Sequence, residues 1–304
     1  MKILLALPHD TLSGAEQYLK MLASHYLKQV DCQVFVVFLK RKTELGWEDL
    51  QGYPNVKLIY TTQASEIKGL PAFMWNLVLL RKYKFEYIYT SHVSLTGIMG
   101  LFIRLRVLNK ENFVGRESTT IFQRFKGIKL LSYKVQYFLG YPSLDLLICQ
   151  TELMRNQLVN ALPGLSKKIR IAVMPNPVDL AAMRQLNRKL PAEDLSRYGR
   201  FVVSAGRLIP EKGFDLLMMA FAKIYKQDKS LKLIILGEGK DRQALENLIK
   251  DLHLEGVIFL PGFAQDVYAY FKAAALAVVS SRVEGFPNVL LQMMSQNHKV
   301  VATA

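Results

Sequence analysis

A short loop near residue 284 has side chains and backbone that could bind a sugar beside a phosphate. It follows the apolar run 276–280 and contains Glu284, Gly285 and Pro287 before a new apolar segment begins. In open α/β sheets, ligands bind at the carboxyl ends of the strands. The backbone N–H groups of a following helix start attract anions. Because Glu284 is itself an anion, we interpret it as an acceptor for sugar hydroxyls and not as a phosphate ligand.

A second loop supplies positive charge. The apolar run 201–205 is followed by Gly206, which we expect to permit a sharp turn, and then by Arg207 and Lys212. Arg207 could bind two oxygens of a diphosphate with its planar fork, and Lys212 could act as a point charge. A solvated basic loop without a ligand remains the alternative. The turn Leu236-Gly237-Glu-Gly-Lys240 also allows close approach of a ligand, but it lacks the third glycine of a dinucleotide fingerprint.

The first half of the chain offers weaker signals of the same kind. Ser13 and Gly14 stand where a helix should begin, so they could bind an anion or a sugar, or simply cap the helix. His92 follows the predicted strand 86–90. Arg116 and Glu117 follow the predicted strand 112–115, so we expect all of these groups at one edge of a sheet.

The elements that would position these residues alternate regularly between strands and helices. The predicted helices include 15–27, 151–160, 215–225 and 241–252. The predicted strands are 2–7, 33–38, 56–60, 86–90, 112–115, 145–149 and 170–174, followed by 201–205, 232–236, 257–260, 276–280 and 299–303. Continuous apolar strands that alternate with helices predict parallel sheets covered on both faces. The fold class is therefore α/β with two doubly wound domains.

A polar stretch at 187–196 interrupts this alternation and separates the two domains. We expect an N-terminal domain at 1–185 and a C-terminal domain at 198–304, facing each other across a cleft. The last predicted strand has no helix after it to cover it, so we expect the C-terminal domain to be incomplete.

The amino-acid composition indicates which classes of molecule the protein could bind. The net charge of +15 favours anionic partners, and the two cysteines in apolar runs suit buried thiols in a reducing cytosol. No nucleic-acid-binding motif is present, and no apolar run is long enough to span a bilayer. The basic apolar segments 71–84 and 101–107 could contact anionic lipid, or they could be core helices with charged ends. The sequence therefore favours a cytoplasmic protein, with the inner face of the plasma membrane as a candidate partner.

Four motifs in fixed order now indicate a family. They are Gly206-Arg207-Leu with Lys212-Gly-Phe, then Leu236-Gly-Glu-Gly, then Val257-Ile-Phe-Leu-Pro-Gly262, then Ser281-Arg-Val-Glu284-Gly-Phe-Pro-Asn. This series resembles the retaining GT-B glycosyltransferases of family 4, also called glycosyl transferases group 1, over most of residues 200–304. Ser13-Gly-Ala-Glu16, His92, Arg116-Glu-Ser-Thr and Met174-Pro-Asn-Pro-Val-Asp179 add weaker likenesses in the first half.

The resemblance implies a role for each matched position. Arg207 and Lys212 would bind the donor diphosphate, Glu284 the donor sugar, and His92 would lie beside the transferred sugar. The acceptor would enter near residues 116–120, with Arg116 and Glu117 as contacts. The remaining donor-binding positions would be Gly14, Gly206, Gly237, Gly262, Phe263, Gly285, Phe286, Pro287, Asn288 and Gln292. Gln292 stands where the family has a second carboxylate for the ribose, and we expect this change to weaken donor binding roughly tenfold.

The predicted function is transfer of a sugar from a nucleotide-diphosphate sugar, with UDP as the expected carrier, to a lipid-linked or polysaccharide acceptor with retention. Such a reaction would serve the synthesis of lipopolysaccharide or another cell-surface glycan. The nucleotide sugar would be a co-substrate, and neither a cofactor nor a metal ion is expected. A truncated or non-catalytic relative is the main alternative, and a different nucleotide-sugar reaction such as epimerisation is a third.

Overall fold

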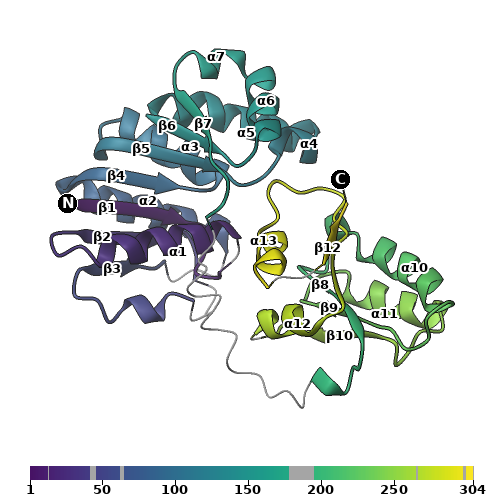
Figure 1. The fold of residues 1–304 in the computed structure, drawn as a ribbon. Helices are drawn as coiled ribbons and strands as arrows, with labels where there is room; N and C mark the ends of the chain where they lie inside the picture. The colour runs from purple at the N-terminus through teal and green to yellow at the C-terminus, as the bar shows by residue number, and fades with distance from the viewer. Residues whose placement is uncertain are drawn as a thin grey trace. The chain divides into compact units, whose positions relative to one another are not determined.

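The computed structural model describes residues 1–12, 14–41, 46–61, 65–177, 195–264, 266–296 and 299–303. The chain forms two compact units, Met1–Asn176 and Pro177–Ala304 (Figure 1). Ser13, Asp179 and most of the predicted polar linker 187–196 lie outside the described residues.

The first unit is built on one parallel sheet of seven strands. The order across the sheet is β3-β2-β1-β4-β5-β6-β7, and every neighbouring pair is parallel. The strands are β1 (Lys2–Leu7), β2 (Gln33–Phe38), β3 (Val56–Ile59), β4 (Lys84–Thr90), β5 (Asn109–Glu117), β6 (Leu146–Cys149) and β7 (Arg170–Val173). The predicted strands are confirmed, with small differences at most of their ends. The largest difference is in β5, which begins earlier, at Asn109, and continues past Gly115 to include Arg116 and Glu117.

Helices cover both faces of this sheet. Because β1 is apolar at nearly every position, Ile3 and Leu5 pack on one face and Leu4 and Ala6 on the other. The helix α1 (Gly14–Leu27) and the short η1 (Glu48–Leu50) lie on the first of these faces. The other face carries α2 (Glu66–Leu79), η2 (Leu80–Lys82), α3 (Val93–Arg104), α4 (Ile121–Arg124), α5 (Gly127–Gly140), η3 (Tyr141–Ser143), α6 (Glu152–Ala161) and α7 (Pro163–Ser166).

The second unit repeats the architecture with five strands in the order β10-β9-β8-β11-β12, again all parallel. Its strands are β8 (Phe201–Ala205), β9 (Lys232–Leu236), β10 (Ile258–Gly262), β11 (Leu276–Val279) and β12 (Val300–Ala302). On one face lie α10 (Phe214–Tyr225) and α11 (Arg242–Asp251); on the other lie α12 (Val267–Ala273) and α13 (Asn288–Ser295) (Figure 1). The turn η4 (Pro210–Lys212) precedes α10.

The two sheets share one connection order, and this order fixes where ligands can bind. The chain moves outward from β1 to β2 and β3, then returns to place β4 on the other side of β1. It does the same around β8, where β11 takes the place of β4. The loops after β1 and β4 diverge at this switch point, as do those after β8 and β11. Such a switch point is where doubly wound sheets bind ligands.

Two helices of the first unit touch through glycines. A Cβ on Gly100 would lie 2.1 Å from the Gly140 carbonyl oxygen, and a Cβ on Gly140 would lie 2.1 Å from the Gly97 oxygen. The backbones of α3 and α5 therefore approach as closely as sterics allow, and this contact fixes which side of α5 faces inward.

Replacing Gly140 by alanine should destabilise the first unit by about 1–3 kcal/mol, because the new methyl group would push α5 away from α3. Urea unfolding followed by circular dichroism measures this change. Gly164→Ala is the matched control, since a Cβ there meets nothing within 4 Å, and it should be neutral or slightly stabilising. Equal stability of the two variants would contradict the close helix crossing.

Candidate functional site

In the second unit, the loops after β8 and β11 meet through an ion pair. The Lys212 ammonium donates to Oε1 of Glu284, and the Ser281 hydroxyl donates to the same oxygen at 2.7 Å. Both charged side chains are largely but not fully buried, with 19% and 24% of their surface exposed. The cation predicted for a diphosphate and the carboxylate predicted for a sugar are thus neighbours at the switch point, 72 residues apart in sequence.

Further bonds hold these two loops together. The Arg282 N–H donates to the Glu211 carbonyl at 2.7 Å, and the Ser280 hydroxyl donates to the Lys212 carbonyl at 2.9 Å. The Arg282 guanidinium binds both oxygens of Asp215 at 2.6 and 2.7 Å and holds the pKa of that carboxyl below its usual value. The position of Glu284 relative to Lys212 is therefore fixed without any ligand.

A left-handed glycine makes this arrangement possible. Gly213 has φ +61°, and a Cβ on it would lie 2.2 Å from the Ser280 carbonyl oxygen. The expectation that Gly206 provides the sharp turn is wrong, since its φ is not in the left-handed region and a Cβ would make only ordinary contacts with Phe214 and Lys212. The residue that must be a glycine in this region is Gly237 (φ +132°), because a Cβ on it would lie 2.0 Å from the carbonyl oxygen of Gly206.

The other predicted donor-binding positions of the second unit lie along the same edge. Gly262 ends β10, and the Phe263 ring after it is 81% exposed, so an apolar plane is available at the strand end. Gly285, Phe286 and Pro287 form the loop before α13. Asn288 is the first residue of α13, and Gln292 lies one turn later and is half-buried. Arg207 is exposed on its loop and pairs with none of the described carboxylates.

In the first unit, the loops after β1 and β4 are linked in the same manner. Nε2 of His92 lies 2.9 Å from Oε1 of Glu16, which is only 1% exposed. Glu16 is in the first turn of α1, which begins at Gly14, and His92 is the N-cap of α3. Sequence reasoning assigned no role to Glu16, because an acidic residue in a first helical turn is usually a solvated partner of the helix dipole.

The predicted acceptor contacts Arg116 and Glu117 are not on a loop. Both belong to β5 and are buried. The Arg116 guanidinium lies 4.2 Å from the centre of the Tyr18 ring, and burial lowers its pKa to about 10. With the Gln150 amide oriented so that its oxygen faces the guanidinium, Gln150 accepts from Arg116 at 2.9 and 3.2 Å. The expectation that both side chains follow the strand is therefore wrong.

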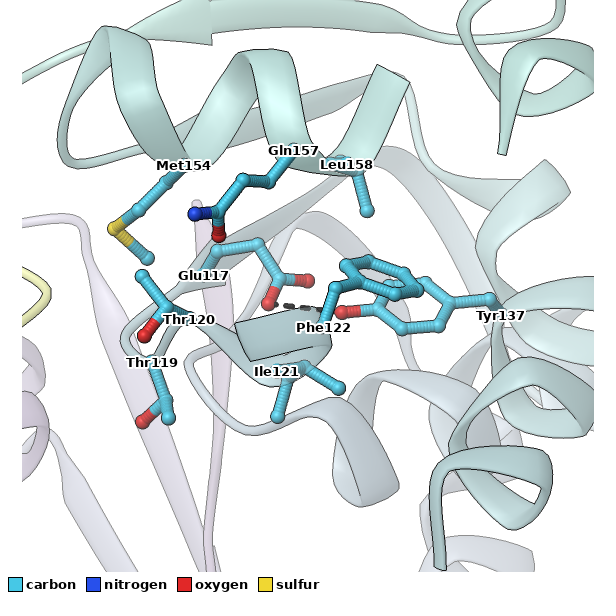
Figure 2. Close-up of a pocket in the computed structure, with 9 residues that line it drawn as sticks. All are labelled: Glu117, Thr119, Thr120, Ile121, Phe122, Tyr137, Met154, Gln157 and Leu158. Carbon is cyan, nitrogen blue, oxygen red and sulfur yellow. Dashed lines mark hydrogen bonds between the residues drawn. The ribbon is translucent and has the colours of Figure 1, made fainter. Parts of the chain in front are cut away.

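Glu117 is one of the residues that line a small pocket in the first unit (Figure 2). Its carboxylate accepts hydrogen bonds from the Tyr141 hydroxyl at 2.7 Å and the Tyr137 hydroxyl at 3.1 Å. Burial nevertheless raises the pKa of Glu117 to about 7, more than these two bonds lower it. The pocket is lined by Glu117, Thr119, Thr120, Ile121, Phe122, Tyr137, Met154, Gln157 and Leu158.

Within the described ranges, no three His, Cys, Asp or Glu side chains are grouped so that they could hold a metal ion. Cys32 and Cys149 are both buried free thiols, as the sequence predicts.

Comparison with known sequences finds similarity to one family over most of the second unit. Residues 189–304 match the family model of glycosyl transferases group 1. An N-acetylgalactosaminyltransferase of Campylobacter jejuni that acts on N-acetylgalactosamine-N,N'-diacetylbacillosaminyl-diphospho-undecaprenol is 34% identical over 64% of this chain and 52% of its own length. An uncharacterized glycosyltransferase of Methanocaldococcus jannaschii is 28% identical over 75% of this chain and 57% of its own. The chain thus spans about half the length of these relatives.

Comparison with solved structures confirms the fold. Anabaena HepE in complex with UDP and glucose has a TM-score of 0.79 at 20% identity, over 99% of this chain and 80% of that one. The lipopolysaccharide glycosyltransferase WaaG has a TM-score of 0.70 at 14% identity, over 99% and 81%. The GT-B fold and the resemblance to group 1 glycosyltransferases, both predicted from the four motifs, are confirmed.

The raised pKa of Glu117 predicts a pH-dependent stability. The folded-state pKa of about 7 lies above the ordinary value of 4.5. The stability that the protonated Glu117 carboxyl group contributes is therefore fully present below about pH 4.5, and it is lost as the pH rises through 7. The loss is on the order of 3 kcal/mol. Glu117→Gln keeps an acceptor for the tyrosines but does not titrate, so its free energy of unfolding should fall less than that of the wild type between about pH 5 and pH 8. Identical pH profiles in urea unfolding would contradict the assignment.

Proposed function

We propose that this chain, whose residues 189–304 match the group 1 glycosyl transferases, moves a sugar from a nucleotide-diphosphate sugar to a lipid-linked or polysaccharide acceptor with retention of configuration. The observation that carries the proposal is the Lys212–Glu284 pair, held between the loops after β8 and β11 at the switch point of the sheet. In this pair, a cation that could bind phosphate lies directly beside a carboxylate that could accept hydrogen bonds from sugar hydroxyls.

Each member of the pair keeps unused bonding capacity. The Lys212 ammonium has three N–H groups and donates one to Glu284, so the other two can bind phosphate oxygens. Oε2 of Glu284 accepts no hydrogen bond from the described side chains, and it can accept from a sugar hydroxyl. The exposed Arg207 on the same loop as Lys212 can add a bidentate contact to the diphosphate.

These groups support transfer by electrostatic stabilisation. As the bond between the sugar and the diphosphate breaks, negative charge grows on the leaving oxygen, and Lys212, Arg207 and the N-terminus of α13 would stabilise it. The acceptor oxygen would bond to the anomeric carbon on the same face from which the diphosphate leaves, and an oxygen of the leaving phosphate can accept the proton of the acceptor hydroxyl. Bond formation on that face retains the configuration of the sugar.

In the first unit, the proposed role of His92 is contact with the transferred sugar. The buried Glu16 carboxylate would fix the orientation of the imidazole by accepting from Nε2. Gly14, at the start of α1, would let the backbone approach the donor. Glu117 does not meet the acceptor directly, because it is buried; we propose that its bonds to Tyr137 and Tyr141 position the residues that follow β5.

The relatives suggest the substrates. HepE binds UDP and UDP-glucose in its solved complexes, which favours UDP as the carrier of the donor sugar. The Campylobacter jejuni enzyme acts on an undecaprenol-linked sugar, which favours a lipid-linked acceptor and a site of action at the inner face of the plasma membrane.

Lys212→Ala should lower kcat by about 10²–10³-fold, as does loss of one stabilising donor in other enzymes, and should abolish nucleotide binding in a calorimetric titration with UDP, GDP and ADP. Lys223→Ala, which removes an exposed lysine from α10, is the control and should change neither quantity. Unchanged turnover in Lys212→Ala would refute the assignment. Absence of nucleotide binding to the wild-type chain would instead favour a non-catalytic relative.

Because two cations already serve the diphosphate, we propose that the reaction needs no metal ion. Turnover measured before and after addition of excess EDTA should be the same within error. Loss of turnover with EDTA, restored by Mg²⁺ or Mn²⁺, would contradict this and would call for metal ligands supplied by the substrate.

A further inference from the structure

Arg282 belongs to the motif Ser281-Arg-Val-Glu284, but no role was predicted for it. Its guanidinium donates to both carboxylate oxygens of Asp215, at 2.7 and 2.6 Å, and to the Pro210 carbonyl oxygen at 2.8 Å. The acceptors belong to two consecutive elements, the turn η4 and the first turn of α10. One side chain from the loop after β11 therefore binds the segment after β8 at two separate places.

These two places lie on either side of Lys212 in the sequence. Pro210 comes two residues before Lys212, and Asp215 comes three residues after it. Arg282 in turn comes two residues before Glu284. The guanidinium thus connects the immediate neighbours of the two residues that are proposed to bind the donor, and its contacts bear directly on the distance between them.

The backbone of Arg282 provides a further anchor. Its N–H donates to the Glu211 carbonyl oxygen at 2.7 Å, and the N–H of Val283 donates to the same oxygen at 3.4 Å. Bonds to a single oxygen leave the loop free to pivot about that atom. A backbone anchor combined with a bidentate side-chain anchor fixes the orientation of the loop as well as its distance.

Stability does not account for this arrangement. The Arg282 and Asp215 side chains are 38% and 41% exposed. Ion pairs with this much exposure contribute little to the free energy of unfolding, because water screens the charges and ordering the side chains costs entropy. The Arg200–Asp228 pair of the same unit is equally short, at 2.7 Å, but it lies at the other edge of the sheet, before β8 and after α10. The two pairs are alike as surface ion pairs, and the Arg282 pair differs in joining the loops of the candidate site.

We propose that Arg282 is a positioning residue for the transfer reaction, held in place by Asp215 and the Pro210 carbonyl. Through this contact the loop after β11 keeps the Glu284 carboxylate directed toward the donor sugar, beside the Lys212 ammonium that binds the diphosphate. The inference rests on the proposed function, because the two residues have these roles in that reaction. Arg282 acts through the loop and not on the substrate, since its guanidinium is bound to protein oxygens.

Loss of this contact should affect turnover more than nucleotide binding. UDP carries no sugar, so its affinity depends on the cations, whereas turnover also requires Glu284 in the correct position. A displacement of about 1 Å in an active site can cost about 100-fold in rate. Arg282→Gln should therefore lower kcat by about 10- to 100-fold and change the Kd for UDP by less than about threefold. Turnover is measured as UDP release from UDP-glucose in the presence of an undecaprenyl-diphosphate-linked sugar, and the Kd by calorimetry.

A charge exchange tests the contact itself. Arg282→Asp and Asp215→Arg should each lower kcat at least as much as Arg282→Gln does, because each change places two like charges together. The double variant restores an ion pair between the same two positions, so its kcat should exceed that of either single variant by about fivefold or more. Independent packing effects of the two side chains would add in the double variant and would give no such recovery.

Hydrogen exchange tests the positioning without any turnover. The amide N–H groups of Arg282 and Val283 are bonded to Glu211, so Asp215→Arg should make both exchange about threefold faster or more, with no change in the strands β8 and β11. Arg200→Asp is the matched control, because it breaks a similar ion pair away from the site. It should change neither kcat, nor the Kd for UDP, nor these exchange rates.

Urea unfolding verifies that every variant folds. Unchanged kcat in Arg282→Gln beside an active wild type would overturn the proposal, and so would a double variant that recovers nothing. A wild-type chain that neither turns over nor binds a nucleotide would refute the proposed function instead. Exchange at the two amides then still decides whether Asp215 and Arg282 hold the loop, and equal rates in Asp215→Arg and wild type would show that they do not.

Discussion

Parallel pairing of non-consecutive strands is the constraint on which the candidate site depends. Because β4 pairs with β1 and β11 pairs with β8, loops that are far apart in sequence end side by side. Each unit uses this proximity in the same way: His92 reaches Glu16 across 76 residues, and Lys212 reaches Glu284 across 72. In both cases a nitrogen base or cation lies beside a carboxylate at the switch point of the sheet, where doubly wound sheets bind ligands.

Stability alone does not explain these two pairs. A partly buried ion pair costs nearly as much in desolvation as it gains in attraction, and an apolar pair of the same volume is often as good. The loops of the second unit are already joined by Arg282 to Asp215 and Glu211, so Lys212 and Glu284 are not needed to hold them. Because other bonds already join these loops, the charges of Lys212 and Glu284 are better explained by a ligand that binds to both side chains.

The sequence predicted the elements well and the environments of single residues less well. Strand positions agree within a few residues because buried parallel strands are continuous apolar runs. The four ordered motifs singled out Lys212 and Glu284, and the structure places these two side chains in contact. Arg116 and Glu117 were misplaced because the apolar signal stops at Gly115, whereas backbone pairing with Ile148 and Cys149 of β6 continues. Similarly, the sequence does not show which glycine of a loop has positive φ, and Gly213 was passed over for Gly206.

The helix α5 connects two features of the first unit that its sequence gives no reason to relate. Its inner side carries Tyr137, which binds Glu117 at the end of β5, and its outer side carries the exposed apolar residues Ile128 and Phe138. The glycine contact with α3 prevents the helix from rolling, so the two sides keep a fixed relation.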